Sequence, residues 1–273
     1  MTVFNPKKEF INIANTYDAT IETLQNVNQV NSWCKRKTHG KISKILNSIP
    51  PNTMMILLNV IYFKGLWKNQ FDPQNTRKSN FYNHGKINNA VEVDMMKIKE
   101  DFNYYEDETV QIIEIPFKKD SSSALIFLPR KIDINIFLSD LDDKKISKYI
   151  KQMFSTKVDL SLPKFEIEFS SELNNALQNL GMKDAFKESK ADFTGMRKEK
   201  DIYINNVIQK VYLKVDETGA EAAALTSVFC VEFSMPIQDK QMIVDRPFIM
   251  FLRSKLLPQG NDILFAAKIE TLK

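Results

Sequence analysis

Few residues in this chain could carry acid–base or nucleophilic chemistry. The sequence has two histidines, His39 and His84, and two cysteines, Cys34 and Cys230, and none of them stands in a CxxC, HExxH or zinc-ligand spacing. No GxSxG, GxGxxG or GxxxxGK[ST] motif occurs. The sequence therefore predicts no enzyme, no catalytic residue, no metal site and no cofactor, although the members of a Ser-His-Asp triad need not be close along a chain.

The segment that stands out instead is 216–236, with the sequence DETGAEAAALTSVFCVEFSMP. When it is read with a period of two, one side is small or apolar throughout: Ala220, Ala222, Ala224, Thr226, Val228 and Cys230. Such a side suits a strand that enters a packed sheet, and the charge of Glu221 on the other side suits an exposed loop in another state. The alanine run also favours a helix or a plain loop, so these interpretations stay open beside that of a segment with two states.

The elements that must position this segment are helices and strands that do not alternate as βαβ units. The pattern therefore predicts the α+β class. Apolar spacing predicts helices over 26–46, around 146–153, and from a Ser170 or Ser171 cap to Gly181. Residues 54–63 form a nearly continuous apolar run, typical of a central strand covered on both faces. Further strands are expected at 112–117 with 124–128 as a hairpin, at 158–162, 165–169 and 207–215, and at 244–252 with 263–269.

Composition limits the other possibilities. The 273 residues carry a net charge of +4, with 26% charged and 43% hydrophobic residues, as expected of a globular protein. Basic groups such as 35–37 and 197–200 are interpreted as solvated surface, so no nucleic-acid partner is predicted. The apolar run at 54–63 is half the length of a membrane span, so no membrane partner is predicted. Only 7 glycines occur, about a third of the usual share, so each is expected where no other residue fits.

At the Ala-rich segment the chain resembles the serpin family. Residues 215–224 (VDETGAEAAA) look like the reactive-loop hinge of that family, and 242–252 (MIVDRPFIMFL) look like its C-terminal signature. The other matching stretches are 31–42 (NSWCKRKTHGKI), 59–67 (NVIYFKGLW), 162–166 (LPKFE), 180–186 (LGMKDAF) and 191–196 (ADFTGM). Because these motifs follow one another over almost the whole chain, the protein is identified as a member of the family.

The resemblance implies a serpin fold: a large central mixed sheet, a second C-terminal sheet or barrel region, and covering helices. It implies one domain over 1–273, lacking the family's N-terminal helices, with a reactive-centre loop at about 217–238. It also implies inhibition of serine proteases by a suicide mechanism, in which the cleaved loop inserts into the large sheet. The hinge residues carried over from the family are Glu217, Gly219, Ala220, Glu221, Ala222, Ala223, Ala224 and Thr226.

Counting from Gly219 by the family's spacing places the scissile bond at Phe233–Ser234, with a possible shift of one or two residues. A phenylalanine before that bond favours chymotrypsin-like or cathepsin G-like targets over trypsin-like ones. The implied partner is a serine protease in a covalent acyl complex, with the inhibitor a monomer. The resemblance to the family implies that the protein acts in the extracellular space. A leaderless cytoplasmic protein is the alternative, because residues 1–10 hold no apolar signal core and no Asn-x-Ser/Thr site occurs.

Two departures from the family pattern keep a second function open. The chain begins late, which suggests a fragment or truncated gene model more than a natural minimal form. Gln209 stands where the family usually has a histidine in a polar network. It needs a partner, which is expected to be Asn59 on a neighbouring strand or a group in the missing N-terminal region. Trp67 is assigned to the same sheet-opening region. The alternative is therefore a non-inhibitory serpin-like binding or storage protein, or an inactive fragment.

Overall fold

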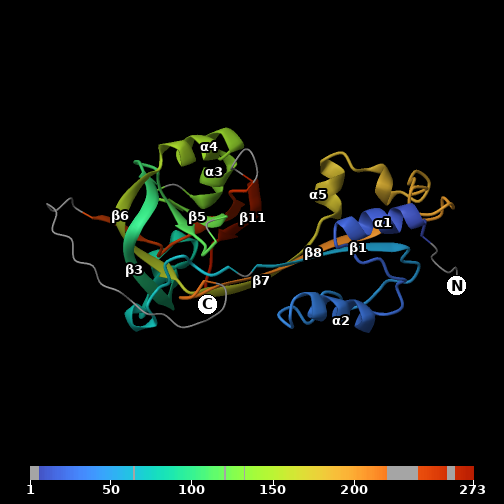
Figure 1. Cartoon of the computed structure of the whole chain (residues 1–273), viewed down its shortest axis with the longest axis horizontal. Helices are drawn as coiled ribbons and strands as arrows, with labels where there is room; N and C mark the ends of the chain where they lie inside the picture. Colours follow the sequence, from blue (N-terminus) through green and yellow to red (C-terminus); the bar gives the residue numbers. More distant parts are fainter. Residues whose placement is uncertain (1–5, 64, 120, 132, 220–238, 257–261) are drawn as a thin grey trace. The chain divides into compact units, whose positions relative to one another are not determined.

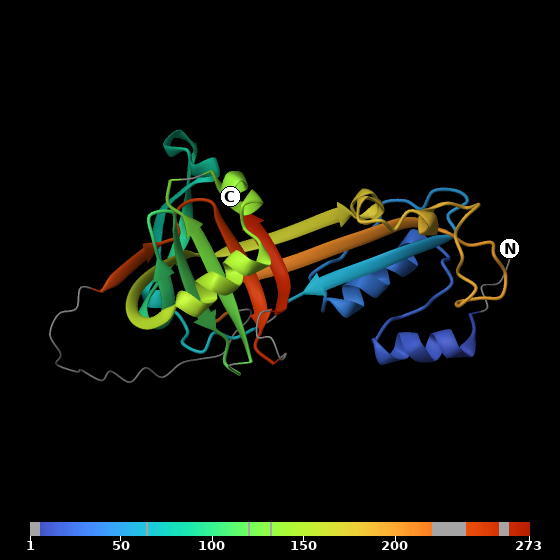
Figure 2. The same cartoon turned by 90° about the horizontal axis from the view of Figure 1, so that it is seen from above.

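The computed structural model describes residues 6–63, 65–119, 121–131, 133–219, 239–256 and 262–273. These residues divide into two compact units, the first made of Met1–Phe63 with Ile167–Leu213 and the second of Lys64–Glu166 with Lys214–Lys273. Figures 1 and 2 show a long-stranded sheet in the first unit and a broader sheet with two helices in the second. That the chain forms a single domain over 1–273 stays a prediction.

The first unit contains a three-stranded sheet in the order β1-β8-β7. Its elements are α1 (Lys8–Thr16), α2 (Val27–Lys37), β1 (Met55–Tyr62), β7 (Phe165–Glu172), α5 (Asn174–Asn179), the 3-10 turn Asp184–Phe186, and β8 (Ile204–Val215). β1 and β8 run parallel, with Asn59 opposite Gln209. Apolar alternation in β8 buries Val207, Val211 and Leu213, as its sequence predicts.

The strand predicted at 54–63 is confirmed as β1. The prediction that both of its faces are covered is wrong for the described residues. β1 stands at the end of the sheet order, Leu57 is 42% exposed and Asn59 is exposed. A continuous apolar run indicates that a strand favours burial. It does not indicate which elements cover the strand, because those are set by tertiary contacts.

The helix predicted over 26–46 is shorter, because it ends at Lys37. The Asn26 side chain caps its start by accepting from Gln29 N at 2.9 Å. At the other end His39 and Gly40 take positive φ values of 50° and 83°, which no α-helix tolerates. The Thr38 hydroxyl then accepts from Ile42 N at 3.0 Å, so Ile42 packs on Cys34 and Tyr212 from a turn.

The cap predicted at Ser170 or Ser171 is also wrong, because both residues belong to β7. The helix that follows, α5, begins at Asn174 without a side-chain cap. Asn174 instead accepts from Val207 N at 2.8 Å and donates to Asn205 O at 2.7 Å, which ties the helix start to β8. Gly181, with φ +105°, stops the helix near the predicted place.

The second unit contains an eight-stranded mixed sheet in the order β11-β10-β5-β4-β3-β6-β9, with β2 paired to β3. The strands are β2 (Arg77–Tyr82), β3 (Ala90–Glu106), β4 (Val110–Pro116), β5 (Ser122–Pro129), β6 (Phe154–Pro163), β9 (Lys240–Ile243), β10 (Phe248–Ser254) and β11 (Asp262–Ile269). Three 3-10 turns lie at Pro73–Asn75, Asn83–Gly85 and Ile87–Asn89. The sheet is mixed because only β6 and β9 pair in parallel among its ladders.

The α+β class and the large mixed sheet are therefore confirmed. The described strands form an open sheet and not a closed barrel, since the order ends at β11 and β9. The predicted hairpin of 112–117 with 124–128 is confirmed as β4 and β5. The strand predicted at 244–252 starts later, at Phe248, because Arg246 leaves the ladder and donates to Pro129 O at 3.0 Å.

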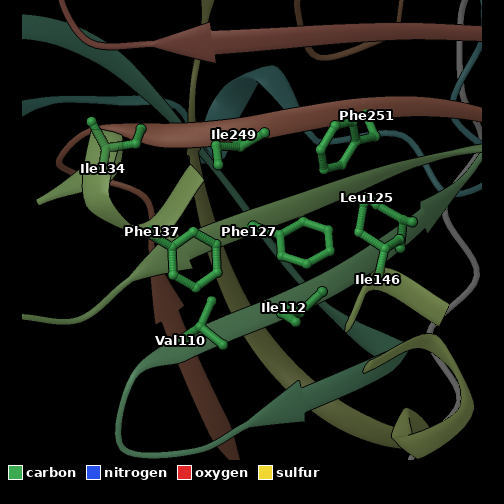
Figure 3. Packing of buried hydrophobic residues seen from close by; sticks show 9 residues of the cluster. All are labelled: Val110, Ile112, Leu125, Phe127, Ile134, Phe137, Ile146, Ile249 and Phe251. Atoms are coloured by element: carbon green, nitrogen blue, oxygen red, sulfur yellow. The ribbon is translucent and has the colours of Figure 1, made fainter. Parts of the chain in front are cut away.

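Two helices, α3 (Ile134–Ser139) and α4 (Asp143–Gln152), cover one face of this sheet (Figure 3). The core between these helices and the sheet contains Val110, Ile112, Leu125, Phe127, Ile134, Phe137, Ile146, Ile249 and Phe251. The rings of Phe127 and Phe251 meet edge to face at 5.4 Å. The helix predicted around 146–153 is confirmed, with Ile146 buried and Tyr149 half-buried against the core.

Among the residues that the structure describes, no helix is both long and apolar enough to cross a membrane. The same residues hold no group of three or more His, Cys, Asp or Glu side chains that could bind a metal ion.

Candidate functional site

Directly after β8 the chain makes a tight turn at 216–219, at the start of the predicted hinge. Asp216 and Gly219 exchange both backbone hydrogen bonds, each at 3.1 Å. The Asp216 carboxylate closes the turn by accepting from Thr218 N at 3.1 Å and from Thr218 Oγ1 at 2.7 Å. Local hydrogen bonds of this kind hold a turn without a sheet ladder.

This turn is fixed to a neighbouring segment, residues 65–71. Trp67 N donates to Thr218 O at 3.0 Å and Phe71 N donates to Glu217 O at 2.9 Å. A third hydrogen bond between the two segments runs from the side chain of Gln70 to Thr218 O at 3.2 Å. Together, residues 216–219 and their partners in 65–71 form what is called here the hinge anchor.

Gly219 is the residue that lets the two segments meet. Its φ is +114°, and an added Cβ would lie 2.2 Å from Gly65 O and 2.6 Å from Trp67 N. Both of those atoms are backbone, so they cannot turn aside as a flexible side chain would. The close approach therefore requires glycine on conformational and on steric grounds.

Trp67 supports the anchor from inside the second unit. Its side chain is 1% exposed, and its indole Nε1 donates to Asp216 O at 2.9 Å. The ring stacks on Phe117 with centroids 4.8 Å apart and planes 8° from parallel, and Phe71 meets it edge-on at 6.4 Å. The turn that follows β8 is thus held to a packed aromatic cluster.

A buried carboxylate completes the anchor. Glu217 is 9% exposed, and its two oxygens accept from Thr76 Oγ1 and Lys164 Nζ, each at 3.0 Å. Partial burial acts to raise the pKa of Glu217, but its own backbone N–H and the hydrogen bonds from Lys164 and Thr76 outweigh burial and hold the pKa below its ordinary value. The pKa of Asp216 is lowered in the same way, with bonds from Thr218 and Lys214 outweighing burial.

A Glu217→Gln variant is expected to be less stable than the parent by about 1 kcal/mol at pH 7, because Lys164 is partly exposed and solvent weakens the pair. The folded-state pKa of Glu217 is depressed, so its contribution is full above the ordinary pKa of 4.5 and is lost as the pH falls below it. Denaturant unfolding at pH 7 and pH 3 measures this difference. A gap that persists at pH 3, or an equal loss in a control with the exposed Glu166 changed to Gln, would contradict the assignment.

The chain that follows the predicted loop is fixed by a second set of polar contacts. Asp239 pairs with Lys99 at 2.5 Å, and Lys240 Nζ donates to Glu106 Oε1 at 2.8 Å. Gln111, which is buried, donates to Gln241 O at 2.8 Å. Residues 239–241 are therefore held on the large sheet where β9 begins.

The structure brings only some of the predicted site residues together. Glu217, Gly219 and Trp67 meet in the hinge anchor of the second unit. Asn59 and Gln209 belong to the first unit, where they are register partners, with Asn59 exposed and Gln209 half-buried. The remaining predicted residues lie outside the described ranges: Ala220, Glu221, Ala222, Ala223, Ala224, Thr226, Phe233 and Ser234.

Sequence reasoning missed the partners that hold the anchor. Lys164 lies inside the matched stretch LPKFE, so its position could have been singled out, although nothing there indicates Glu217 as its partner. Thr76 and Phe117 lie in no matched stretch, and each meets the anchor through tertiary contacts only.

The chain is similar to known proteins in sequence and in fold. The family model described as Serpin (serine protease inhibitor) matches residues 2–271. Serpin B10 of Bos taurus is 34% identical over 242 residues, covering 87% of this chain and 60% of that protein. Iripin-2 of Ixodes ricinus is 34% identical over 250 residues, covering 90% and 61%. The chain thus spans about 60% of the length of these relatives.

Two solved structures are similar in fold. The thermophilic serpin Tengpin in its native state superposes with a TM-score of 0.87 at 31% identity, covering all of this chain and 71% of that one. Thyroxine-binding globulin in complex with thyroxine gives a TM-score of 0.86 at 26% identity, covering 98% and 72%.

Proposed function

Since the chain belongs to the serpin family, whose members are in general serine protease inhibitors, we propose that this protein inhibits serine proteases by loop insertion. In the proposed mechanism a protease serine attacks the carbonyl of Phe233 and gives up its hydroxyl proton. The Phe233–Ser234 peptide bond breaks, the Ser234 amine leaves with a proton, and Phe233 remains as an acyl ester on the protease. The cleaved loop then enters a sheet as a new strand and carries the protease with it. Insertion of a serpin loop is a known switching transition that releases stored strain.

The observation that carries this proposal is the hinge anchor. An inserting strand needs one fixed end, and the bonds of 216–219 to Trp67, Gln70 and Phe71 supply it directly before the Ala-rich segment. The residues proposed to enter the sheet, Ala220, Ala222, Ala224 and Thr226, are small enough to pass into a packed interior. An Arg in place of Ala220 would bury an unpaired charge at a cost of several kcal/mol, so insertion should fail.

Target choice follows from the proposed scissile bond, Phe233–Ser234. A large aromatic side chain fits a hydrophobic primary pocket and offers no cation for the acidic pocket of trypsin-like enzymes. We therefore propose chymotrypsin-like and cathepsin G-like proteases as partners, met by a monomer in the extracellular space. A leaderless cytoplasmic form is the alternative.

Incubation with chymotrypsin tests the proposal. We expect a band on denaturing gels that contains both proteins, and a released C-terminal fragment that begins at Ser234 by mass spectrometry. A Phe233→Arg variant should move complex formation from chymotrypsin to trypsin, because only the primary pocket contact changes. Cleavage of both forms without any denaturant-resistant complex would contradict inhibition.

A second candidate function is non-inhibitory binding or storage. One observation favours it: thyroxine-binding globulin, solved with thyroxine, is among the similar folds. Loop cleavage by chymotrypsin without complex formation, in a protein that remains folded, is the result expected from this candidate.

A further inference from the structure

The segment that joins α3 to α4 is acidic, although the chain as a whole has a net charge of +4. Residues 139–143 have the sequence SDLDD, so Ser139 is followed by Asp140, Asp142 and Asp143. No other serine of the sequence has an acidic residue at each of the positions +1, +3 and +4. The proposed inhibition makes no use of this segment.

The structure places the hydroxyl of Ser139 where an enzyme can reach it. Ser139 is the last residue of α3 and is exposed, and residues 140–142 belong to no helix or strand. Its Oγ donates to Ile136 O at 2.8 Å, a bond that engages the hydroxyl proton and leaves the oxygen its two lone pairs. An exposed helix end of this kind opens locally at low cost, which lets a modifying enzyme bind it in an extended form.

The carboxylates that follow Ser139 keep their charge for a partner. Asp142 and Asp143 are exposed, and neither takes part in an ion pair among the described residues. Asp142 caps α4 by accepting from Lys145 N at 2.8 Å, which occupies one of its two carboxylate oxygens. Asp140 pairs with the Lys145 side chain but is still 77% exposed. The segment therefore presents three carboxylates to solvent beside an accessible hydroxyl.

Ser189 provides a comparison within the same chain. It is exposed and has Asp192 at +3, but Lys190 stands at +1. Lys200 Nζ pairs with Asp192 at 2.8 Å, and the same carboxylate accepts from Thr194 N at 3.0 Å. The fold thus neutralises the acidic residue that follows Ser189, whereas it leaves those that follow Ser139 charged and accessible.

From this contrast we propose that Ser139 is phosphorylated by an acidophilic serine kinase, whose basic groups bind the carboxylates at +1, +3 and +4. In this step Ser139 Oγ attacks the γ-phosphorus of a nucleoside triphosphate, and a new oxygen–phosphorus bond forms. The bond from the γ-phosphorus to the bridging oxygen breaks, and the nucleoside diphosphate leaves. The hydroxyl proton passes to a base of the kinase.

A phosphate on Ser139 loosens α3. The modified oxygen no longer donates to Ile136 O, and the dianion stands next to Asp140 at the C-terminal end of the helix, where negative charge is unfavourable. α3 covers the core of the second unit through Phe137, whose ring centroid lies 6.4 Å from that of Phe127. Phosphorylation therefore weakens the cover of this core and leaves the contacts of the hinge anchor unchanged.

Incubation of the uncleaved protein with casein kinase II and Mg-ATP tests the site. Mass spectrometry of peptides locates the phosphate. We expect it on Ser139, with at least about tenfold less on Ser189, because only the first has unpaired carboxylates at +3 and +4. A Ser139→Ala variant should lose the main phosphopeptide.

A matched pair of double variants tests the role of the acidic residues. Asp142→Asn with Asp143→Asn keeps the cap of α4, because Asn caps a helix as well as Asp does, and should be phosphorylated at least about tenfold more slowly. The control, Glu100→Gln with Asp101→Asn, removes two exposed carboxylates of β3 and should stay within about twofold of the parent rate. Circular dichroism checks that both variants are folded.

Hydrogen exchange of the phosphorylated and unmodified chains measures the effect on α3. We expect amides within 134–141 to exchange about fivefold faster after phosphorylation, and those of 216–219 to stay unchanged. Four results would overturn the proposal: no phosphate on Ser139, an equal rate at Ser189, equal rates in the two double variants, or unchanged exchange at 134–141 in the phosphorylated chain. No protease is present in these measurements, so their failure leaves the inhibitor proposal untouched.

Discussion

Replacing Gly219 with Ala is expected to destabilise the protein by about 3 kcal/mol or more. The added Cβ would meet Gly65 O at 2.2 Å and Trp67 N at 2.6 Å, and the φ of +114° is unfavourable for any residue with a side chain. Relief of the overlap must separate the two backbone segments, which weakens the bond from Trp67 N to Thr218 O. Urea unfolding followed by circular dichroism measures the loss.

Gly181 provides the matched control. Its φ of +105° is similar, but no heavy atom lies within 4 Å of the position that a Cβ would take. A Gly181→Ala variant should therefore lose only the conformational part, about 1–2 kcal/mol. Equal losses in the two variants would mean that the close approach at Gly219 contributes nothing, contrary to the hinge anchor described above.

A Trp67→Phe variant is expected to lose about 3 kcal/mol. The substitution removes the indole bond to Asp216 O, which keeps only its bond from Gly219 N, and it reduces the stacking area on Phe117. The lost buried hydrogen bond contributes about 1 kcal/mol, and the smaller ring contributes the rest through lost packing. Urea unfolding measures the stability, and protease digestion should show faster cleavage near 216–219.

Trp33 is the matching control, because the sequence has 2 tryptophans and the second has the opposite environment. Its Nε1 is buried with no acceptor among the described residues. A Trp33→Phe variant removes this unsatisfied donor, which offsets the lost apolar area, so its stability should stay within about 1 kcal/mol of the parent. A larger loss at Trp33 than at Trp67 would contradict the importance of the indole bond to Asp216.

Periodicity predicted those parts of the fold that depend on local pattern. The alternation of Val207, Val211 and Leu213 gave the correct strand, because a strand with one buried face repeats every two residues. The apolar spacing at Ile146 and Tyr149 gave the correct helix for the analogous reason. Glycine scarcity also pointed to Gly219, whose close backbone contact leaves no room for a side chain.

Other features depend on contacts that no local pattern reports. The helix expected to continue to residue 46 ends at Lys37 because the Thr38 hydroxyl and the left-handed His39 favour a turn. The bond from Thr76 to Glu217 joins residues 141 positions apart, so only the folded chain brings them together. The side chains that hold Glu217 therefore could not be predicted from the sequence, and the hinge role of 217–226 stays a prediction.

The proposed inhibition requires that the segment after the hinge anchor inserts into a sheet once it is cleaved. The most direct measurement is the thermal unfolding midpoint before and after a protease cuts the loop. Insertion adds a strand and buries Ala220, Ala222 and Ala224, so the midpoint should rise by about 10 °C or more, and an Ala220→Arg variant should show no rise. An unchanged or lower midpoint in the cleaved parent chain would contradict insertion.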